Sequence, residues 1–275
     1  MPTMSETKVM LTGATGFLGH YLADQLTRRG LAFVTVGRGR ADVHCDLADE
    51  PELAGALEQV RPSHVLHCGA MALMAECERD PRRAAAVNTD SVAVMLGRSR
   101  ARLLLVSTDL VFDGEHAPYA EDARPRPLSV YGSTKVEAEE LVRASARGLV
   151  VRVPLLFGKS FDGRRGATDM IRSAFADRRR VTLFSDETRT PLHASDAADA
   201  LVTALVDERQ VGVLHLPGPE RVTRAEFGLR FCVARGLDTT LLGMALCNDS
   251  KRPRDTSLLG SFVAPRDLAA MLADS

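Results

Sequence analysis

Short apolar runs alternate with longer amphipathic stretches through the first half of the chain. The apolar runs have the length of strands, and the stretches between them repeat their apolar residues at helical spacing. The predicted strands are residues 8–12, 32–36, 65–67 and 103–106, and the predicted helices are residues 17–29, 51–60 and 81–98. Strands that are apolar throughout are typical of parallel sheets, because both faces of such sheets are buried. Strands alternating with helices in this way predict an α/β fold with a doubly wound parallel sheet.

The alternation weakens after Val153, and residues 158–166 are rich in glycine and charge. We therefore predict a main domain over residues 1–157 and a smaller lobe over residues 158–275. Elements around residues 190–216 are expected to return to the main sheet. The two parts are expected to share one core.

A glycine-rich turn, GATGFLG at residues 13–19, connects the first predicted strand to the first predicted helix. Gly13 can make the tight turn, Gly16 lets the backbone approach a diphosphate, and Gly19 lets the helix pack close to the strand. The free N–H groups and the positive dipole end of the helix would then hold the phosphates. This context predicts a dinucleotide-binding Rossmann fold, although the spacing is GxxGxxG rather than GxGxxG. The alternative is a glycine-rich turn that binds no ligand.

The end of the second predicted strand indicates which dinucleotide binds. Enzymes that prefer NAD usually place an acidic residue there, about 20 residues on, to bind the ribose 2′-hydroxyl. Here Arg38 and Arg40 follow the strand, and no acidic residue precedes Asp42. Because a guanidinium suits a 2′-phosphate, we predict NADP(H) as the cofactor, with Arg38 the first choice and Arg40 the second. The alternative is a pair of solvated loop arginines.

A second motif joins Tyr131, Lys135 and Thr108. Tyr131 and Lys135 lie four residues apart in a segment with helical spacing, so their side chains share one helix face. A phenol has a pKa of about 10, and a nearby ammonium would favour its ionised form. Tyr131 could then deliver the proton that a ketone needs after hydride addition. Thr108 follows an apolar strand at the edge where ligands of open α/β sheets bind.

Composition excludes several other classes of protein. The 275 residues are 45% hydrophobic and 26% charged, as in a globular protein, and their net charge of −1 leaves no basic excess for nucleic acid or an acidic membrane. No apolar run approaches the length of a membrane helix, and the opening residues lack the pattern of a signal peptide. The five cysteines form no CxxC pair, which predicts reduced thiols, no metal site and a cytoplasmic location.

These motifs together resemble those of the extended short-chain dehydrogenases/reductases. The matching segments are GATGFLG (13–19), Asp46-Leu47, HCGA (67–70), Asn88 and YGSTK (131–135). Within that family the chain is more narrowly similar to the dTDP-4-dehydrorhamnose reductase group. That similarity lies in STDLVFDG (107–114), YAED (119–122), PLSVYG (127–132) and Lys251-Arg252-Pro253. The resemblance covers most of the chain and is faint after Gly158.

The resemblance implies roles for individual residues. It makes residues 1–157 an NADP-binding domain and residues 158–275 a substrate-binding lobe. The implied catalytic residues are Thr108, Tyr131 and Lys135, and the implied substrate contacts are Asp109, Val111, Phe112 and Arg252. With the two arginines predicted above, the cofactor-binding residues are Gly13, Thr15, Gly16, Phe17, Leu18, Gly19, Arg38, Arg40, Asp46, Leu47, Gly69, Ala70, Ala72, Tyr131 and Lys135. Asn88 would either orient Lys135 or be a satisfied buried amide.

Some positions depart from the family pattern or remain open. The chain has no tryptophan and three tyrosines, so few aromatic side chains are left to stack on a nucleotide base. Several arginines could hold a substrate diphosphate, although each taken singly fits a solvated helix face. They are Arg164, Arg165, Arg178, Arg179, Arg180, Arg252 and Arg254. His193 is expected to be structural, with Ser195 or Asp196 capping the helix that follows.

The resemblance leaves three functions open. The first is an NADPH-dependent ketoreductase of a 4-keto-6-deoxy nucleotide sugar, or of a similar small polar ketone, in deoxysugar biosynthesis. The second is an epimerase or dehydratase of nucleotide sugars that keeps its cofactor bound, for which Asp109 is the candidate additional acid. The third is a non-catalytic NADP-binding regulatory subunit, like the β subunit of methionine adenosyltransferase. Because members of the family often pair through helices, we expect a homodimer.

Overall fold

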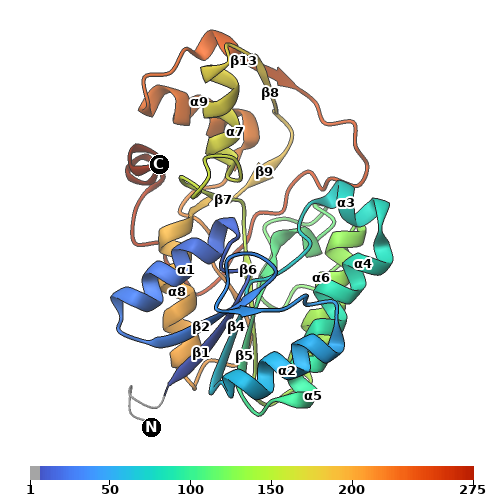
Figure 1. The fold of residues 1–275 in the computed structure, drawn as a ribbon. Coiled ribbons are helices and arrows are strands. Elements are labelled where there is room, and N and C mark those ends of the chain that lie inside the picture. The colour runs from blue at the N-terminus through green and yellow to red at the C-terminus, as the bar shows by residue number, and fades with distance from the viewer. Residues whose placement is uncertain (1–6) are drawn as a thin grey trace.

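A seven-stranded parallel sheet forms the centre of the molecule in the computed structural model, which describes residues 7–275 (Figure 1). Its strand order is β11-β6-β5-β4-β1-β2-β3. The strands are β1 (Lys8–Thr12), β2 (Ala32–Gly37), β3 (Val43–His44), β4 (His64–His67), β5 (Arg102–Thr108), β6 (Gly148–Val153) and β11 (Gly212–His215). The order reverses between β1 and β4, which opens a crevice at the carboxyl ends of these strands. The predicted doubly wound α/β fold is confirmed.

Helices cover both faces of the sheet (Figure 1). One face carries α1 (Phe17–Arg28) and α8 (Ala194–Val206), and the other carries α2 (Glu50–Val60), α5 (Ser91–Arg98) and α6 (Val130–Arg143). Alternate residues of β1 belong to the hydrophobic clusters on opposite faces of the sheet. Val9 and Leu11 pack under α1 and α8, whereas Met10 packs under α2 and α5. Both faces are therefore apolar, as the continuous apolar runs predicted.

The predicted helix over residues 81–98 is interrupted. It consists of α4 (Pro81–Ala85), one π-helical turn at Ala86–Asp90, and α5, and is preceded by α3 (Met74–Arg79). A π turn inserts one residue into the helical repeat and often lies at a functional site. Here it contains the buried side chain of Asn88, whose contacts are described below.

A smaller lobe lies above the carboxyl ends of the strands (Figure 1). Its helices are α7 (Ala167–Ala176), α9 (Arg224–Ala234) and α10 (Leu268–Asp274). Its strand pairs are β7 (Leu156–Phe157) with β10 (Leu192–His193), β8 (Val181–Phe184) with β13 (Leu242–Ala245), and β9 (Thr188–Arg189) with β12 (Val222–Thr223). Between these elements the chain returns to the main sheet as α8 and β11, and β11 pairs with β6.

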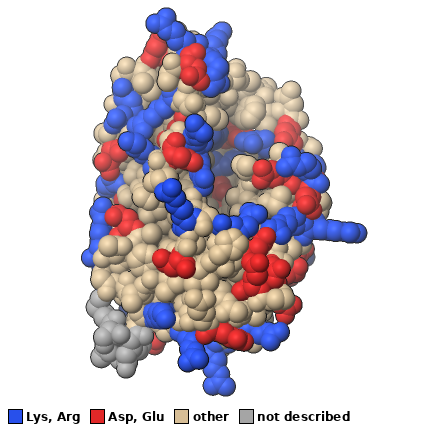
Figure 2. Space-filling model, viewed as in Figure 1, with Lys and Arg blue, Asp and Glu red and all other residues tan. Residues whose placement is uncertain are grey.

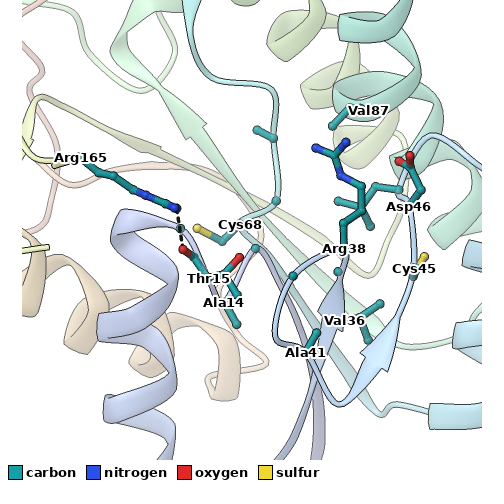
Figure 3. A pocket seen from close by; sticks show the side chains of 17 residues that line it. Ala14, Thr15, Val36, Arg38, Ala41, Cys45, Asp46, Cys68, Val87 and Arg165 are labelled. Carbon is teal, nitrogen blue, oxygen red and sulfur yellow. Dashed lines mark hydrogen bonds between the residues drawn. The ribbon is translucent and has the colours of Figure 1, made fainter. Parts of the chain in front are cut away.

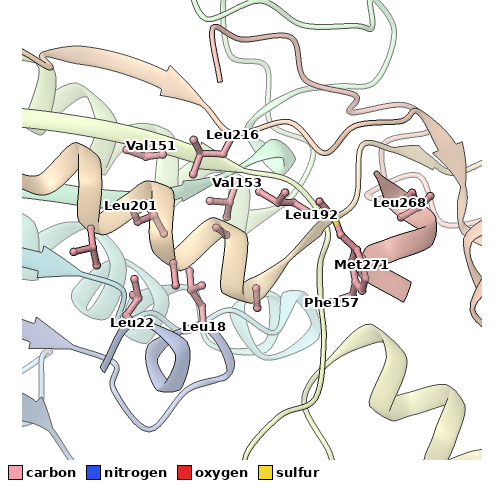
Figure 4. Close-up of a cluster of buried hydrophobic side chains, with 14 of the residues drawn as sticks. Leu18, Leu22, Val151, Val153, Phe157, Leu192, Leu201, Leu216, Leu268 and Met271 are labelled. Atoms are coloured by element: carbon pink, nitrogen blue, oxygen red, sulfur yellow. The ribbon is translucent and has the colours of Figure 1, made fainter. Parts of the chain in front are cut away.

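One hydrophobic cluster extends from the sheet into the smaller lobe (Figure 4). It joins Leu22 of α1 and Leu201 of α8 to Phe157, Leu192 and Met271. The beginning of α8 is capped by His193, whose Nδ1 accepts from the Ser195 backbone N–H at 3.2 Å. The expectation that Ser195 or Asp196 caps this helix was wrong.

Charges of both signs are interspersed over the face drawn in Figure 2. Within residues 7–275, no helix is both long and apolar enough to cross a bilayer.

Candidate active site

A cavity of about 510 Å³ opens at the carboxyl ends of β1, β2 and β4. It continues into a second cavity of about 490 Å³, because both are lined by the glycine-rich turn and by Cys68 and Ala70. The first cavity contains the predicted residues Gly13, Thr15, Gly16, Arg38, Asp46, Leu47, Gly69 and Ala70. The second contains Phe17, Leu18, Ala72, Thr108, Asp109, Tyr131 and Arg252. The crevice between β1 and β4 therefore brings the two predicted motifs together.

The glycine-rich turn has no room for larger residues. Gly13 has a φ of +73°, and a β-carbon there would lie 2.6 Å from the backbone nitrogen of Gly69. A β-carbon at Gly19 would collide with the carbonyl oxygen of Gly13, which already accepts from the Gly16 N–H at 2.9 Å. The turn thus presents bare backbone at the start of α1, which is the cradle that a dinucleotide diphosphate requires.

Arg38 projects into the first cavity (Figure 3). Asp42 is the nearby acid, but its carboxylate accepts from the Thr35 backbone N–H at 2.9 Å and from the Thr35 hydroxyl at 2.8 Å. These bonds hold the pKa of Asp42 below its usual value. Arg40 does not line either cavity in residues 7–275. This end of the site therefore offers a guanidinium, with the nearby carboxylate already engaged, which fits a 2′-phosphate.

Arg165 reaches the first cavity from the smaller lobe. Its Nη1 donates to the carbonyl oxygen of Thr15 at 2.7 Å (Figure 3). Its Nε donates to Asp162 at 2.9 Å. The sequence had suggested Arg165 only as one of several arginines for a substrate diphosphate. The structure places it instead beside the glycine-rich turn, on the cofactor side of the crevice.

The second cavity contains Thr108 at the end of β5 and Tyr131 in the first turn of α6. Ser129 caps α6, since its Oγ accepts from the Gly132 N–H at 3.1 Å. Lys135 lies one turn beyond Tyr131 and is 2% exposed. This places a hydroxyl, a phenol and a buried ammonium at the carboxyl edge of the sheet, next to the glycine-rich turn.

Burial sets the protonation of these groups. It raises the pKa of Tyr131, and the carboxylate of Asp109 raises it further, while a hydrogen bond with Thr108 opposes the shift. Burial lowers the pKa of Lys135 to about 8, with Glu139 opposing. We expected Lys135 to favour the phenolate, but in this structure burial and Asp109 have the larger effect. The phenol is therefore protonated near neutral pH, as a proton donor must be.

Asn88 is a satisfied buried amide. Its Oδ1 accepts from the Met71 N–H at 2.8 Å, and its Nδ2 donates to the Met71 carbonyl at 3.1 Å and to the Thr134 hydroxyl at 3.0 Å. These bonds join the segment beside Ala72 to the helix that carries Tyr131 and Lys135. Asn88 thus positions the walls of the second cavity.

Two of the four expected substrate contacts lie elsewhere. Val111 and Phe112 are fully buried in a separate cluster with Tyr119 and Leu258. The ring of Phe112 stacks on Tyr119 with centroids 4.0 Å apart. The structure therefore gives these residues a packing role in place of the expected substrate contact. Of the remaining predicted residues, Gly19 and Lys135 line neither of the two cavities in the described part of the chain.

Sequence reasoning missed three charged residues of the second cavity: Glu187, Arg189 and Arg224. All three belong to the smaller lobe, where the sequence pattern and the family resemblance are both weak. Glu187 precedes the short strand β9 and Arg189 lies within it, and this spacing is not typical of a site.

Residues 7–259 match the protein family described as the RmlD substrate binding domain. A dTDP-4-dehydrorhamnose reductase from Streptomyces griseus is 35% identical over 216 residues, which cover 75% of this chain and 69% of that protein. The methionine adenosyltransferase 2 subunit beta of Danio rerio is 29% identical over 229 residues, covering 80% of this chain and 71% of that protein.

The fold is similar to that of several solved structures. The dTDP-4-dehydrorhamnose reductase from Bacillus anthracis str. Ames in complex with NADP superposes with a TM-score of 0.86, at 20% identity, over 97% of both chains. A UDP-glucose 4-epimerase from Thermotoga maritima gives a TM-score of 0.85, at 20% identity, over 97% of this chain and 96% of that one. At these identities the likeness concerns the fold.

Proposed function

The chain belongs to the RmlD substrate binding domain family, and from this we propose that it is an NADPH-dependent ketoreductase of a nucleotide-linked deoxysugar. The proposed substrate is a 4-keto-6-deoxy nucleotide sugar or a similar small polar ketone. The observation that carries the proposal is that Thr108 and Tyr131 line a cavity continuous with the glycine-rich turn and Arg38. A cofactor and a carbonyl compound can therefore share one crevice.

The residues of this chain have distinct roles in the proposed reaction. A reduced nicotinamide bound beside the glycine-rich turn would supply the hydride that the carbonyl carbon needs. The hydroxyl of Thr108 and the phenol of Tyr131 hold the carbonyl oxygen by hydrogen bonds. Tyr131 then gives its proton to the alkoxide oxygen, and the product is an alcohol. The positive charge of Lys135 stabilises the resulting phenolate until a proton from solvent restores the phenol.

The contacts of Asp109 favour reduction over epimerisation. Asp109 was the candidate additional acid, but its carboxylate accepts from the Thr256 hydroxyl at 2.5 Å and lies 3.4 Å from Arg189 Nε. These contacts support a structural role for Asp109.

A regulatory subunit is the second candidate function. It is favoured by relatives named methionine adenosyltransferase 2 subunit beta, which are similar over most of this chain. Against it stands the complete set of Thr108, Tyr131 and Lys135, which a subunit without catalytic activity does not need.

An assay of NADPH oxidation with a panel of 4-keto nucleotide sugars and free ketones separates these functions. The absorbance of the reduced nicotinamide at about 340 nm follows the reaction. We expect turnover with at least one ketone and its loss in Tyr131→Phe. Tight NADPH binding without turnover of any ketone would favour the regulatory subunit.

The homodimer that the family resemblance implies stays a prediction, and sizing of the purified protein tests it. A cytoplasmic location also stays a prediction.

A further inference from the structure

A cluster of buried and half-buried charges forms the wall of the second cavity that faces the smaller lobe. Three arginines, Arg189, Arg224 and Arg252, and two acids, Asp109 and Glu187, line this cavity. They come from β9, the start of α9, the segment after β13, and the segments that follow β5 and β8. Three arginines face two acids, and burial raises the pKa of Asp109, so positive charge is in excess.

Two of the three arginines are already paired. Arg252 binds Glu187 through two bonds, Nε to Oε1 at 2.6 Å and Nη2 to Oε2 at 2.9 Å. Arg189 lies 3.4 Å from Asp109, and its terminal nitrogens donate to the carbonyl oxygens of Thr188, Pro253 and Arg254. Neither guanidinium is therefore free for a ligand without breaking a buried bond.

Arg224 is the exception. Its Nη1 is buried, and no acceptor within residues 7–275 bonds to it. Its backbone N–H donates to the Glu187 carbonyl at 2.7 Å, which fixes the start of α9 against the cluster. Burial lowers the pKa of Arg224 to about 10, with Glu187 opposing, so the group is charged at neutral pH. A buried charged donor without a partner is unfavourable unless a ligand satisfies it.

We infer that Arg224 binds an oxyanion of the substrate, a phosphoryl or carboxylate oxygen, inside the second cavity. The inference rests on the proposed function, because that function makes the second cavity the substrate-binding half of the crevice. A guanidinium is suited to oxyanions, and the excess positive charge of the cluster matches an anionic group. Arg224 lines the same cavity as Thr108 and Tyr131, so the anion belongs to the molecule whose carbonyl is reduced.

This assignment moves the anion site away from Arg252. The family resemblance pointed to Arg252, but its charge is neutralised by Glu187. Arg252 instead holds Glu187 in place, and the backbone of Glu187 anchors Arg224. Arg252 is thus a positioning residue, whereas Arg224 contacts the substrate.

The test measures oxyanion binding without turnover. Protein saturated with NADP⁺, so that the cofactor cavity is filled, is titrated with inorganic phosphate and separately with acetate in a calorimeter. We expect binding of at least one oxyanion, weakened about tenfold or more in Arg224→Gln and less in Arg224→Lys. Arg230→Gln is the matched control, because Arg230 lies on the same helix, is exposed and is paired with Glu220 and Glu226.

Equal oxyanion affinity in the wild type and Arg224→Gln, or no binding by the wild type at millimolar phosphate and acetate, would overturn the inference. Thermal unfolding of Arg224→Gln checks that the variant is folded, and Arg224→Lys retains the charge if it is not. The substrate then distinguishes the two sources of oxyanion. A rise in KM for a nucleoside diphosphate sugar identifies a phosphoryl oxygen, and a rise confined to a keto acid identifies a carboxylate. If oxyanions bind as expected but no ketone is reduced, the proposed reaction fails and the anion site stands.

Discussion

Glu139 and Arg152 form a buried ion pair, with Arg152 Nη2 2.7 Å from Glu139 Oε2 and side chains that are 1% and 2% exposed for the arginine and the glutamate. The Ser107 hydroxyl also donates to Glu139 Oε1 at 2.5 Å. Glu139 lies one turn beyond Lys135 on α6, and Ser107 precedes Thr108 on β5. The pair and Ser107 therefore join α6, β5 and β6 directly behind the proposed catalytic residues.

We predict that Glu139→Gln lowers the free energy of unfolding by about 3–5 kcal/mol, because it leaves the Arg152 charge buried and unpaired. The double variant Glu139→Gln with Arg152→Met should lose less free energy of unfolding, since no buried charge is left without a partner. Urea unfolding measures the free energy of unfolding of both variants. Glu226→Gln, which breaks an exposed pair with Arg230, is the control and should cost about 0–1 kcal/mol. An equal loss in the single and double variants would contradict the prediction.

His215 should make the protein less stable in mild acid. Its Nε2 lies 3.2 Å from Arg152 Nη1, which can only donate, so Nδ1 carries the proton and donates to the Leu259 carbonyl at 2.8 Å. Burial, and then the Arg152 charge, lower the pKa of His215 to about 4. Between about pH 6.5 and this value the unfolded chain binds a proton that the folded chain does not, so stability falls as pH falls.

The contribution of His215 to this slope is at most about 1.4 kcal/mol per pH unit. His64, His67 and His193 also have lowered pKa values and act in the same direction. Urea unfolding from pH 8 to pH 4, about the range of these titrations, measures the free energy of unfolding. This free energy should fall less steeply with falling pH in His215→Gln than in the wild type. Identical slopes would show that His215 titrates alike in the folded and unfolded chain.

Tyr131→Phe should lower kcat by about 10²-fold or more, because general acid catalysis contributes about 10²–10⁴-fold. The NADPH dissociation constant, measured by fluorescence, should change little, since the rest of the cofactor cavity is intact. Tyr21→Phe is the control: its hydroxyl donates to the Lys159 carbonyl at 2.7 Å, and its ring does not line either cavity in residues 7–275. Full turnover by Tyr131→Phe would refute the acid role.

Arg38→Ala should reduce the preference for NADPH over NADH, because the lost guanidinium would no longer bind the 2′-phosphate. The ratio of kcat/KM for the two cofactors measures this preference, and a loss of about 1.4 kcal/mol would change it tenfold. Arg40→Ala is the matched control two residues away, outside the cavity. If Arg40→Ala changes the ratio and Arg38→Ala does not, the second choice made from the sequence holds.

Arg165→Ala should weaken binding of both NADPH and NADH by a similar factor, because Arg165 lies beside the diphosphate cradle and not at the ribose end. Arg164→Ala is the control, as Arg164 is a neighbouring exposed arginine that does not line the cofactor cavity in residues 7–275. Titration with each cofactor measures the effect. A change in the NADPH affinity alone would instead place Arg165 at the 2′-phosphate.

Local patterns in the sequence were enough for the strands β1, β2, β4 and β5 and for the glycine-rich turn and Arg38 of the first cavity. Apolar runs and the glycine-rich turn are contiguous in sequence, and the fold of each depends mainly on its own residues. The second cavity differs, because Asp109, Glu187, Arg224 and Arg252 meet only through tertiary packing between segments far apart in the chain. Val111 and Phe112 were misassigned for the same reason, since the segment that covers them is formed by Tyr119 pairing with Leu258.

The return of the chain to the main sheet constrains any exchange of the smaller lobe between relatives. Because α8 and β11 complete the Rossmann half, a chimera joined once after Phe157 would replace the recipient's own edge strand and covering helix with those of the donor. A donor lobe would have to be grafted as two inserts, residues 158–191 and 217–275, with the recipient's own segment kept between them. An exchange of the smaller lobe between relatives would therefore require two separate inserts.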